Sequence, residues 1–227
     1  MKPSTQQIMK LEAFTLDVLS NFSQINNSIV ILEGNEIRTM PENKTILAEA
    51  TVSNSFSQTF GIYDLKKLLG CLSLTKDPDI VLREKHLEVT SGGNKIKYMY
   101  TDPSRIVTPS KRINLPSAEA TFDLDGSVLT DVLKASSVLS VDDLCVSSEN
   151  GEVIVTVLDK TDVTSNSATF SVNGSSKGDF KALLKISNLK LIHDDYTVKI
   201  SSKGISLFQS KNHDLKYYIA IEADSKF

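Results

Sequence analysis

The sequence repeats one order of elements four times, and this order limits the folds that the chain can adopt. Each repeat begins with a short strand-like run, continues with a short helix that has one apolar face, and ends with two or three strand-like runs. The repeats begin near Lys10, Phe60, Phe122 and Phe180. Because a unit of roughly 50 residues cannot bury a core alone, we expect the repeats to pair into two domains of about 110 residues each.

The second repeat shows the helical pattern most clearly, in the segment FGIYDLKKLLGCLSL (residues 60–74). Four leucines there recur at i, i+3, i+4 and i+7, which predicts one apolar helix face. Asp64 stands just before them and is a good N-cap residue. Lys66 and Lys67 fall on the opposite side of the predicted helix. The four leucines are Leu65, Leu68, Leu69 and Leu72.

The helix faces that we expect to point away from the sheets carry mainly lysine and small polar residues. The carboxylates gather instead in strands, turns and helix starts. Exposed helix faces usually carry lysine and serine for solubility, so this pattern alone leaves open whether the lysines face a partner. The outward positions are Asp17, Ser20 and Asn21 on the first helix, Lys66, Lys67, Gly70 and Ser73 on the second, Lys134, Ser136 and Ser137 on the third, and Lys185, Ser187, Asn188 and Lys190 around the fourth.

The segment DPSRIVTPSKRINLPSA, residues 102–118, has no clear periodicity and contains Pro103, Pro109 and Pro116. A proline-punctuated segment of this length is typical of an interdomain linker. We therefore expect an α+β protein with similar domains at 1–108 and 109–227. Each domain should have two short helices packed on antiparallel sheets, since a helix with one apolar stripe must pack on a sheet or another helix.

Composition excludes several classes of protein. No apolar run approaches the roughly 18 residues that span a bilayer, and the first residues lack the pattern of a signal peptide, so we expect no membrane contact and a cytoplasmic location. Cys71 and Cys145 lie far apart without a CxxC partner, which disfavours a disulfide framework or a zinc site. The formal net charge of −3 argues against a protein coated in basic residues, but not against a nucleic-acid partner.

No pattern in the chain predicts catalysis, a metal or a cofactor. His86, His193 and His213 are scattered, and no phosphate-binding glycine motif occurs. The paired carboxylates Asp142-Asp143 and Asp194-Asp195 precede strands at equivalent places of the third and fourth repeats. We interpret them as parts of a shared turn after each helix, and we expect the protein not to be an enzyme.

Three segments resemble the sliding clamps of T4-like bacteriophages. They are IYDLKKLLGCLSL (62–74), the ending YYIAIEADSKF (217–227) and MKLEAFTLDVLSNFSQIN (9–26), of which the first two are the more specific. The resemblance covers nearly the whole chain in length and element order, although 76–120 and 147–180 match only by pattern. It implies a DNA-clamp fold and a ring of three identical subunits, in which sheets form the outer wall and helices line a central hole.

The resemblance implies that helix lysines face duplex DNA. A clamp must slide, and spaced lysines attract phosphates without reading sequence, while an acidic outer surface repels DNA from the wrong face. Ser20 and Ser137 depart from the family, which tends to place basic residues there, so the hole is expected to be less positive than in relatives. The candidate DNA-facing residues are Lys66, Lys67, Lys134 and Lys190, with Lys10 and Lys185 as weaker candidates at helix entries.

The resemblance also implies two protein-binding surfaces. Subunits should join through edge strands, for which we expect Asn94–Tyr100 of one copy against Ser167–Val172 of the next. The expected interface residues are Lys95, Ile96, Tyr98, Tyr100, Thr169 and Phe170. Partner peptides should dock in an apolar groove near the linker. The expected groove residues are Ile106, Val107, Pro109, Ile113, Tyr218, Ile221 and Ala223. For both surfaces the alternative that these residues pack within their own domains stays open.

The function that follows from the resemblance is a DNA polymerase processivity factor. Its implied partners are duplex DNA, the replicative polymerase, an ATP-dependent clamp loader, two further copies of the chain and phage transcription factors. It would act in the cytoplasm of the infected bacterial host. The alternatives are a structural or virion interaction protein of α+β build, which would use the lysines only for solubility, and an enzyme with a diffuse site.

Overall fold

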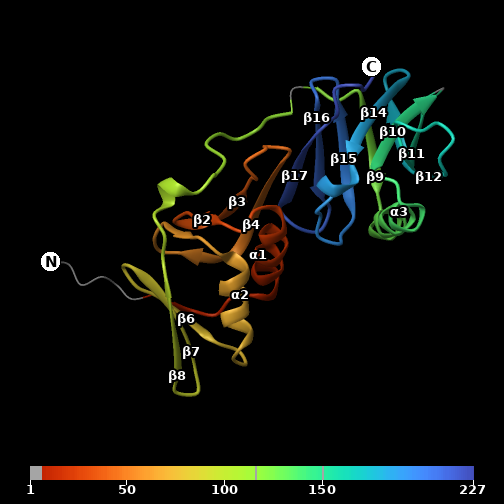
Figure 1. Ribbon diagram of the computed structural model, residues 1–227. Coiled ribbons are helices and arrows are strands. Elements are labelled where there is room, and N and C mark those ends of the chain that lie inside the picture. Colours follow the sequence, from red (N-terminus) through yellow and green to blue (C-terminus); the bar gives the residue numbers. More distant parts are fainter. Residues whose placement is uncertain (1–6, 116, 150) are drawn as a thin grey trace. The chain divides into compact units, whose positions relative to one another are not determined.

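Antiparallel sheets with helices packed against them make up the described part of the chain, residues 7–115, 117–149 and 151–227 of a computed structural model (Figure 1). Pro116, one of the predicted linker prolines, lies outside these residues. The chain divides into two compact units. The first runs to Lys44 and continues with Ala48–Ser110, and the second combines Thr45–Leu47 with Lys111–Phe227.

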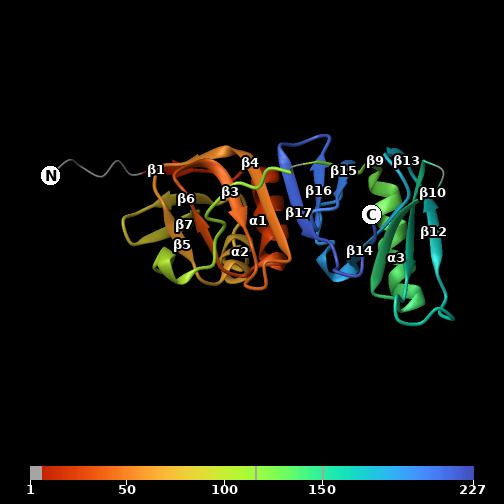
Figure 2. The ribbon, with the colours of Figure 1, turned by 90° about the horizontal axis from the view of Figure 1, so that it is seen from above.

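The first unit contains strands in the order β4-β3-β2-β5 and a second sheet in the order β1-β6-β7-β8. Helices α1 and α2 lie side by side in both views (Figures 1 and 2). Its elements are β1 (Gln7–Met9), α1 (Ala13–Ile25), β2 (Ile29–Ile31), β3 (Gly34–Thr39), β4 (Ile46–Phe56), β5 (Phe60–Ile62), α2 (Leu65–Ser73), β6 (Asp79–Leu82), β7 (His86–Ser91), β8 (Asn94–Met99) and the 3₁₀ turn η1 (Pro103–Arg105).

The apolar faces of α1 and α2 supply much of the first unit's core, as their leucine and phenylalanine spacing predicts. Val18, Leu19, Phe22 and Ile25 of α1 are buried. On α2, Leu65, Leu68 and Leu72 are buried and Leu69 is half-buried. Fully burying one such side chain stabilises the fold by about 1.5–3 kcal/mol. The core therefore fixes which side of each helix is left outward.

Two polar side chains hold the start of α2. Asp64 Oδ1 accepts a hydrogen bond from the Lys67 backbone N–H at 2.9 Å, which confirms the predicted N-cap. Asn27, which follows α1, accepts hydrogen bonds from two more backbone N–H groups of this first turn. Its backbone oxygen accepts from Leu65 N–H at 2.7 Å, and its Oδ1 accepts from Lys66 N–H at 3.0 Å. The Lys67 N–H bond also lowers the pKa of Asp64. These bonds satisfy helix donors that would otherwise lack partners.

The second unit contains strands in the order β13-β9-β15-β16-β17 and a sheet in the order β12-β11-β10-β14. Helix α3 packs against β11 and β12 (Figure 2). Its elements are β9 (Ala120–Leu124), α3 (Gly126–Leu139), β10 (Asp143–Glu149), β11 (Glu152–Leu158), β12 (Ala168–Ser171), β13 (Asn173–Ser176), β14 (Phe180–Lys185), the 3₁₀ turn η2 (Ile186–Asn188), β15 (Tyr196–Ser201), β16 (Ile205–Ser210) and β17 (Leu215–Ala220).

The expectation of two helices in each domain is wrong for the second unit, where the predicted fourth helix is only the three-residue 3₁₀ turn η2. The Ile186 N–H bonds to Asp142 O at 2.9 Å, and the Leu189 N–H closes the single turn onto Ile186 O at 2.9 Å. The segment predicted as this helix, ISNLKLI (residues 186–192), contains Ser187 and Asn188, which are weak helix formers. A helix this short gains too few hydrogen bonds to offset its nucleation cost.

Two of the predicted outward positions are also wrong. Ser136 of α3 is buried, and its Oγ donates to Val141 O at 2.6 Å while its backbone oxygen accepts from Val141 N–H at 3.1 Å. These bonds close the helix where Ser140 takes a left-handed φ of 55°. Asn21 of α1 is buried as well. In both cases a polar residue type suggested an outward position, although the helix rotation places it inside.

Glu88 of β7 lies at the centre of a cluster of basic side chains on the β1-β6-β7-β8 sheet. Its carboxylate is 2.9 Å from Arg83 Nη2, 3.2 Å from Lys95 Nζ and 3.3 Å from His86 Nε2. Although the residue is buried, the Arg83 guanidinium holds the pKa of Glu88 at about 2, with further help from Lys95 and His86. The cluster ties the loop before β7 to the edge strand β8.

The cap of α2 can be tested by the Asp64→Ala variant. Loss of the oxygen that accepts from Lys67 N–H should lower the melting temperature by about 2–4 °C, the size expected for one lost helix cap. Asp64→Asn is the matched control, because an asparagine oxygen accepts the same bond and should restore most of the loss. Thermal unfolding followed by circular dichroism measures both. Equal melting temperatures for Asp64→Ala and the unaltered protein would contradict this role.

The Glu88 cluster predicts a particular loss of stability in acid. Because the folded pKa of Glu88 lies below its ordinary value of 4.5, its contribution is complete above about pH 4.5 and is lost as the pH falls toward 2. Urea unfolding of Glu88→Gln should therefore show lower stability than the unaltered protein at pH 7, with the gap closing between about pH 4.5 and pH 2. Glu84→Gln, an exposed neighbour, serves as the control. A gap that stays constant across this range would show that the cluster does not set the pKa.

Candidate nucleic-acid interface

Lysines on α2 and α3 stand on the outward faces of helices whose other faces are buried. Lys66, Lys67 and Lys134 are all exposed. Within residues 7–115, 117–149 and 151–227, no carboxylate lies within 4.0 Å of these three ammonium groups. Asp64 is near the α2 pair, and the positive charges of Lys67 and Lys66 contribute to its lowered pKa. These positions can attract phosphates without first giving up an ion pair.

The other three predicted DNA-facing lysines have different surroundings. Lys10 forms an ion pair with Asp77, whose hydrogen bond raises the pKa of the lysine. Lys185 Nζ lies 2.6 Å from Oδ1 of Asp143, a residue that is only 3% exposed. Lys190 is half-buried and has further polar or electrostatic interactions. Lys10 and Lys185, the two weaker candidates, thus already have their charge matched within the chain.

Two carboxylates also stand on the outward helix faces. Asp17 of α1 and Asp131 of α3 are exposed. The predicted placement of acids in strands, turns and helix starts does not include Asp131. This residue lies three positions before Lys134, on the same side of α3. These acids reduce the positive potential of the helix faces. Ser20 and Ser137, at positions where the family tends to place basic residues, predict the same effect.

The two strands predicted to join subunits are both edge strands of their sheets. β8 pairs only with β7, and β12 pairs only with β11, within the residues that the structure describes. Their outer backbone groups are therefore available to another strand. Several apolar side chains in this part of each unit are exposed: Met99 on β8 by 56%, Leu74, the C-cap residue of α2, by 74%, and Val138 on α3 by 81%.

The aromatic residues of these edges face partly inward. Tyr98 Oη donates to the backbone oxygen of Asp64 at 2.7 Å, which places α2 beside β8. Tyr100 stacks on Phe60 with ring centroids 4.7 Å apart, and burial raises the pKa of Tyr100 to about 12. On β12, Phe170 is half-buried. Tyr98 and Tyr100 are thus engaged in their own unit, the alternative left open by the sequence.

Of the remaining interface candidates, Lys95 and Thr169 are polar and exposed, whereas Ile96 is apolar. Lys95 is exposed and belongs to the Glu88 cluster, and Ile96 is half-buried on the same strand. Thr169 of β12 is exposed and bonds across the pair to Thr156, with 3.0 Å between the two hydroxyl oxygens.

The predicted groove residues fall into both units. In the first, Ile106 and Pro109 are buried and Val107 is half-buried. In the second, Ile113 packs against a cluster of three buried residues, Leu47, Leu207 and Tyr218, together with Leu115 and Ile205. Ile221 is buried, whereas Ala223 is exposed.

The structure therefore brings two of the expected groove residues, Ile113 and Tyr218, together, and adds Leu47, Leu207, Leu115 and Ile205, which are not among the expected groove residues. Alternation in β16 places Leu207 on the same face as Ile205, which could have indicated the apolar patch there. The membership of Leu47 could not have been found in this way, because it comes from a distant part of the chain.

The paired carboxylates serve structural bonds. Asp195 Oδ1 accepts from Gly126 N–H at 2.8 Å and so holds the first turn of α3. Asp194 accepts from Ser210 Oγ and from its neighbour's backbone N–H. In the part of the chain that the structure describes, no group of three or more His, Cys, Asp or Glu side chains could hold a metal ion. No described helix is long and apolar enough to cross a membrane.

Two known protein families match this chain, and together they cover nearly all of it. The family described as DNA polymerase processivity factor matches residues 10–108, and the family described as gp45 sliding clamp, C terminal, matches residues 121–223. The sliding clamp of Vibrio phage KVP40 is 37% identical over 223 residues, which are 95% of this chain and 100% of that protein. The sliding clamp of Enterobacteria phage T4 is 28% identical over 226 residues, 96% of this chain and 98% of that protein.

Solved structures show the same fold at low sequence identity. The proliferating cellular nuclear antigen of Entamoeba histolytica has a TM-score of 0.72 at 14% identity, covering 96% of this chain and 98% of that one. That of Thermococcus kodakaraensis also has a TM-score of 0.72 at 14% identity, covering 96% and 99%. The sequence matches and the shared fold together show that this chain belongs to the T4-like phage family of sliding clamps, the DNA polymerase processivity factors.

Proposed function

We propose that this sliding clamp encircles duplex DNA as a ring of three copies and tethers the replicative DNA polymerase to it. The observation that carries the proposal is the exposure of Lys66, Lys67 and Lys134 on helices whose opposite faces are locked into the core. Because burial fixes the rotation of α2 and of α3, the lysine-bearing surface of each helix cannot turn inward. We propose that these surfaces line the hole, with Lys190 at their margin and Lys10 and Lys185 contributing less.

Lysine suits a protein that must hold DNA and still slide along it. Its ammonium is a flexible point charge, whereas the guanidinium of arginine forms bidentate bonds that fix a position. Phosphate contacts carry no sequence information, and small polar side chains such as Ser20 and Ser137 can hold water between protein and phosphate. The exposed acids Asp17 and Asp131 weaken the attraction further, which lowers the barrier to sliding at the cost of affinity for DNA.

The two edge strands β8 and β12 support one way for the ring to close. We propose that β8 of one copy adds to β12 of the next, which is a head-to-tail contact that closes when its rotation fits three copies. Tyr98 places α2 beside β8, and α3 packs against β12. Joining the strands would therefore bring the exposed Leu74 and Val138 into an interface. One similar solved structure is a PCNA2–PCNA3 complex from Sulfolobus tokodaii, which supports association between chains of this fold.

Partner proteins would bind the apolar cluster of the second unit. The half-buried Ile113 and Ile205 beside Tyr218 offer apolar surface to an extended peptide. Another similar structure is the C-terminal region of FEN-1 bound to the PCNA of A. fulgidus. We propose that the polymerase and the clamp loader use this surface, with phage transcription factors as further clients. The clamp itself would act without catalysis, in the cytoplasm of the infected host, and the loader would supply ATP hydrolysis.

The DNA-facing role of α2 predicts the behaviour of the Lys66→Glu, Lys67→Glu double variant. Because both side chains are exposed, the melting temperature should change little. The amount of clamp that becomes loaded on DNA at low salt should fall by about tenfold or more, since the change reverses two charges in every copy, and the difference from the unaltered protein should narrow as salt rises and screens the phosphate contacts of both. Retained clamp on nicked circular DNA and the length of polymerase products measure the effect.

The matched control reverses two exposed lysines outside the helices, Lys177 and Lys203. It has the same net charge change, so a general loss of electrostatic attraction would affect both variants alike. Equal retention by the two double variants would show that α2 does not face DNA.

The proposed interface predicts that Val138→Asp yields a folded monomer. Val138 is 81% exposed in the single chain, so the substitution should leave the monomer's stability within about 0.5 kcal/mol. A buried, unpaired carboxylate in the interface should prevent association. Native mass spectrometry at micromolar concentration reads the outcome. Leu32→Asp, at another exposed apolar residue (45%), is the control and should keep three copies. A stable trimer of Val138→Asp would place the interface elsewhere.

A further inference from the structure

The last residues of the chain cover the second edge of the β12-β11-β10-β14 sheet. We call the segment Glu222–Phe227 the strap. Four hydrogen bonds join it to β14: Glu222 N–H donates to Leu183 O, Lys226 N–H donates to Lys181 O and Lys181 N–H donates to Lys226 O, each at 2.8 Å, and Leu183 N–H donates to Ser225 Oγ at 2.9 Å. Lys181 and Lys226 thus form an antiparallel β-bridge. The strap occupies this edge as an added strand would.

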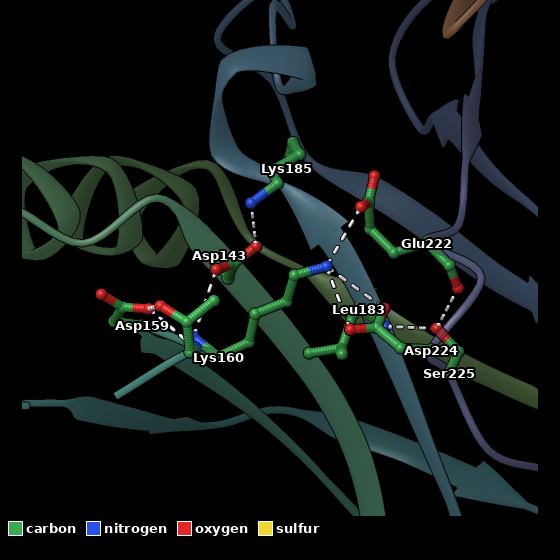
Figure 3. Close-up of polar contacts among 9 residues, drawn as sticks. Asp143, Asp159, Lys160, Leu183, Lys185, Glu222, Asp224 and Ser225 are labelled. Atoms are coloured by element: carbon green, nitrogen blue, oxygen red, sulfur yellow. Dashed lines mark hydrogen bonds and ion pairs between the residues drawn. The ribbon is translucent and has the colours of Figure 1, made fainter. Parts of the chain in front are cut away.

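Lys160, just after β11, fastens the strap. Its ammonium lies 3.2 Å from Glu222 Oε2 and 3.0 Å from Asp224 Oδ2, with only 18% of the lysine side chain exposed (Figure 3). The Asp224 carboxylate raises the pKa of Lys160, and Lys160 in turn lowers the pKa of Asp224. One cation therefore holds two carboxylates that flank Ala223.

The Lys160 backbone is held in place by the buried carboxylate of Asp143. The Lys160 backbone N–H donates to Asp143 Oδ2 at 3.2 Å, and the other oxygen of this buried carboxylate accepts from Lys185 Nζ at 2.6 Å (Figure 3). At the far end of the strap, Phe227 stacks on Phe180 with ring centroids 6.0 Å apart and planes within 6°. The two ends and the middle of the strap are each tied to the sheet.

An uncovered β14 would be a strong acceptor for another strand. It has six residues, including buried Ala182, Leu183 and Leu184, whereas β12, the edge proposed to join subunits, has four. Unpaired backbone edges of this kind recruit strands from other chains. A copy that added β8 to β14 would use a different rotation from one that added it to β12, and a head-to-tail contact with the wrong rotation gives open chains of subunits.

We propose that the strap guards β14, so that β12 is the edge of this sheet that accepts β8 from another copy. Lys160 is the positioning residue of this guard. The inference rests on the ring of the proposed function for its purpose, but the guarded edge itself is a property of one chain. The four-stranded sheet of the first unit, β1-β6-β7-β8, has β8 at one edge and the three-residue strand β1 at the other. Short edge strands recruit partners poorly.

Two variants and a control test the guard. Lys160→Met keeps the length of the side chain and removes its charge, and a chain ending at Asp224 removes Ser225–Phe227. Lys203→Met, at an exposed lysine of the same unit, is the control. Hydrogen exchange at Lys181 and Leu183 reports on the edge, native mass spectrometry reports on assembly, and circular dichroism confirms folding.

In both variants we expect exchange at Lys181 and Leu183 to rise at least tenfold, and species larger than the trimer to appear as concentration increases. Adding Lys97→Pro on β8 should remove these species, because proline cannot donate a strand hydrogen bond. The Lys203→Met protein should match the unaltered chain. If the edge amides exchange faster while the masses stay unchanged, the strap is not a guard. If exchange does not rise in Lys160→Met, Lys160 does not position the strap.

The same measurements test the guarded edge independently of the proposed ring of three copies. An unaltered chain that stays monomeric at all concentrations would overturn the ring of three copies. The guard would still predict association of the shortened chain alone, through β14, and its failure to associate would overturn the guard as well.

Discussion

Each α-helix of this clamp has one apolar face, and the sheets bury it. That burial fixes the rotation of α1, α2 and α3, because Phe22, Leu65 and Leu129 cannot leave the core without losing several kcal/mol between them. The outward positions then follow from helical spacing. On each of α2 and α3, residues on the buried side of the helix hold the lysines (Lys66, Lys67 and Lys134) on its outward side. The proposed function needs no specific bond to DNA, only this fixed orientation of charge.

The edges of the sheets are the second constraint. A sheet leaves unpaired backbone groups at both ends, and a ring-forming chain must leave some edges open and close others. Here β8 and β12 keep theirs open among the described residues, and the strap covers β14. The distinction depends on polar contacts such as the pairing of Lys160 with Glu222 and Asp224, which a count of apolar residues would not show.

Local sequence patterns predicted what depends on local structure. The leucines of α2, its Asp64 cap and the buried side of α1 are confirmed. The α+β clamp fold, which the resemblance to sliding clamps implied, is confirmed as well. The prediction of a fourth helix is wrong, because a seven-residue segment with Ser187 and Asn188 gains too few hydrogen bonds to offset helix nucleation. The predicted outward position of Ser136 is also wrong, because its side chain makes a buried hydrogen bond at the C-terminal end of α3. The assignments of DNA-facing, interface and groove residues, and the boundary at 108/109, stay predictions.

Local sequence patterns could not predict contacts between residues that lie far apart in the chain. The pair of Lys185 with Asp143 joins residues 42 positions apart, and Lys160 reaches Asp224 over 64 positions. Neither partner is marked by periodicity, because each lies at the end of a strand or in the segment after it. The cluster of Leu47 with Leu207 and Tyr218 likewise needs the three-dimensional structure.

The central claim is that the lysine-bearing helices surround DNA that passes through a closed ring. The most direct measurement is retention of loaded clamp on closed circular DNA compared with the same DNA after one double-strand cut, in salt high enough to screen phosphate contacts. The account predicts that the clamp stays on the circle and slides off the ends of the cut molecule. Equal loss from both forms would show that the protein is held by surface contacts alone, and would contradict encirclement.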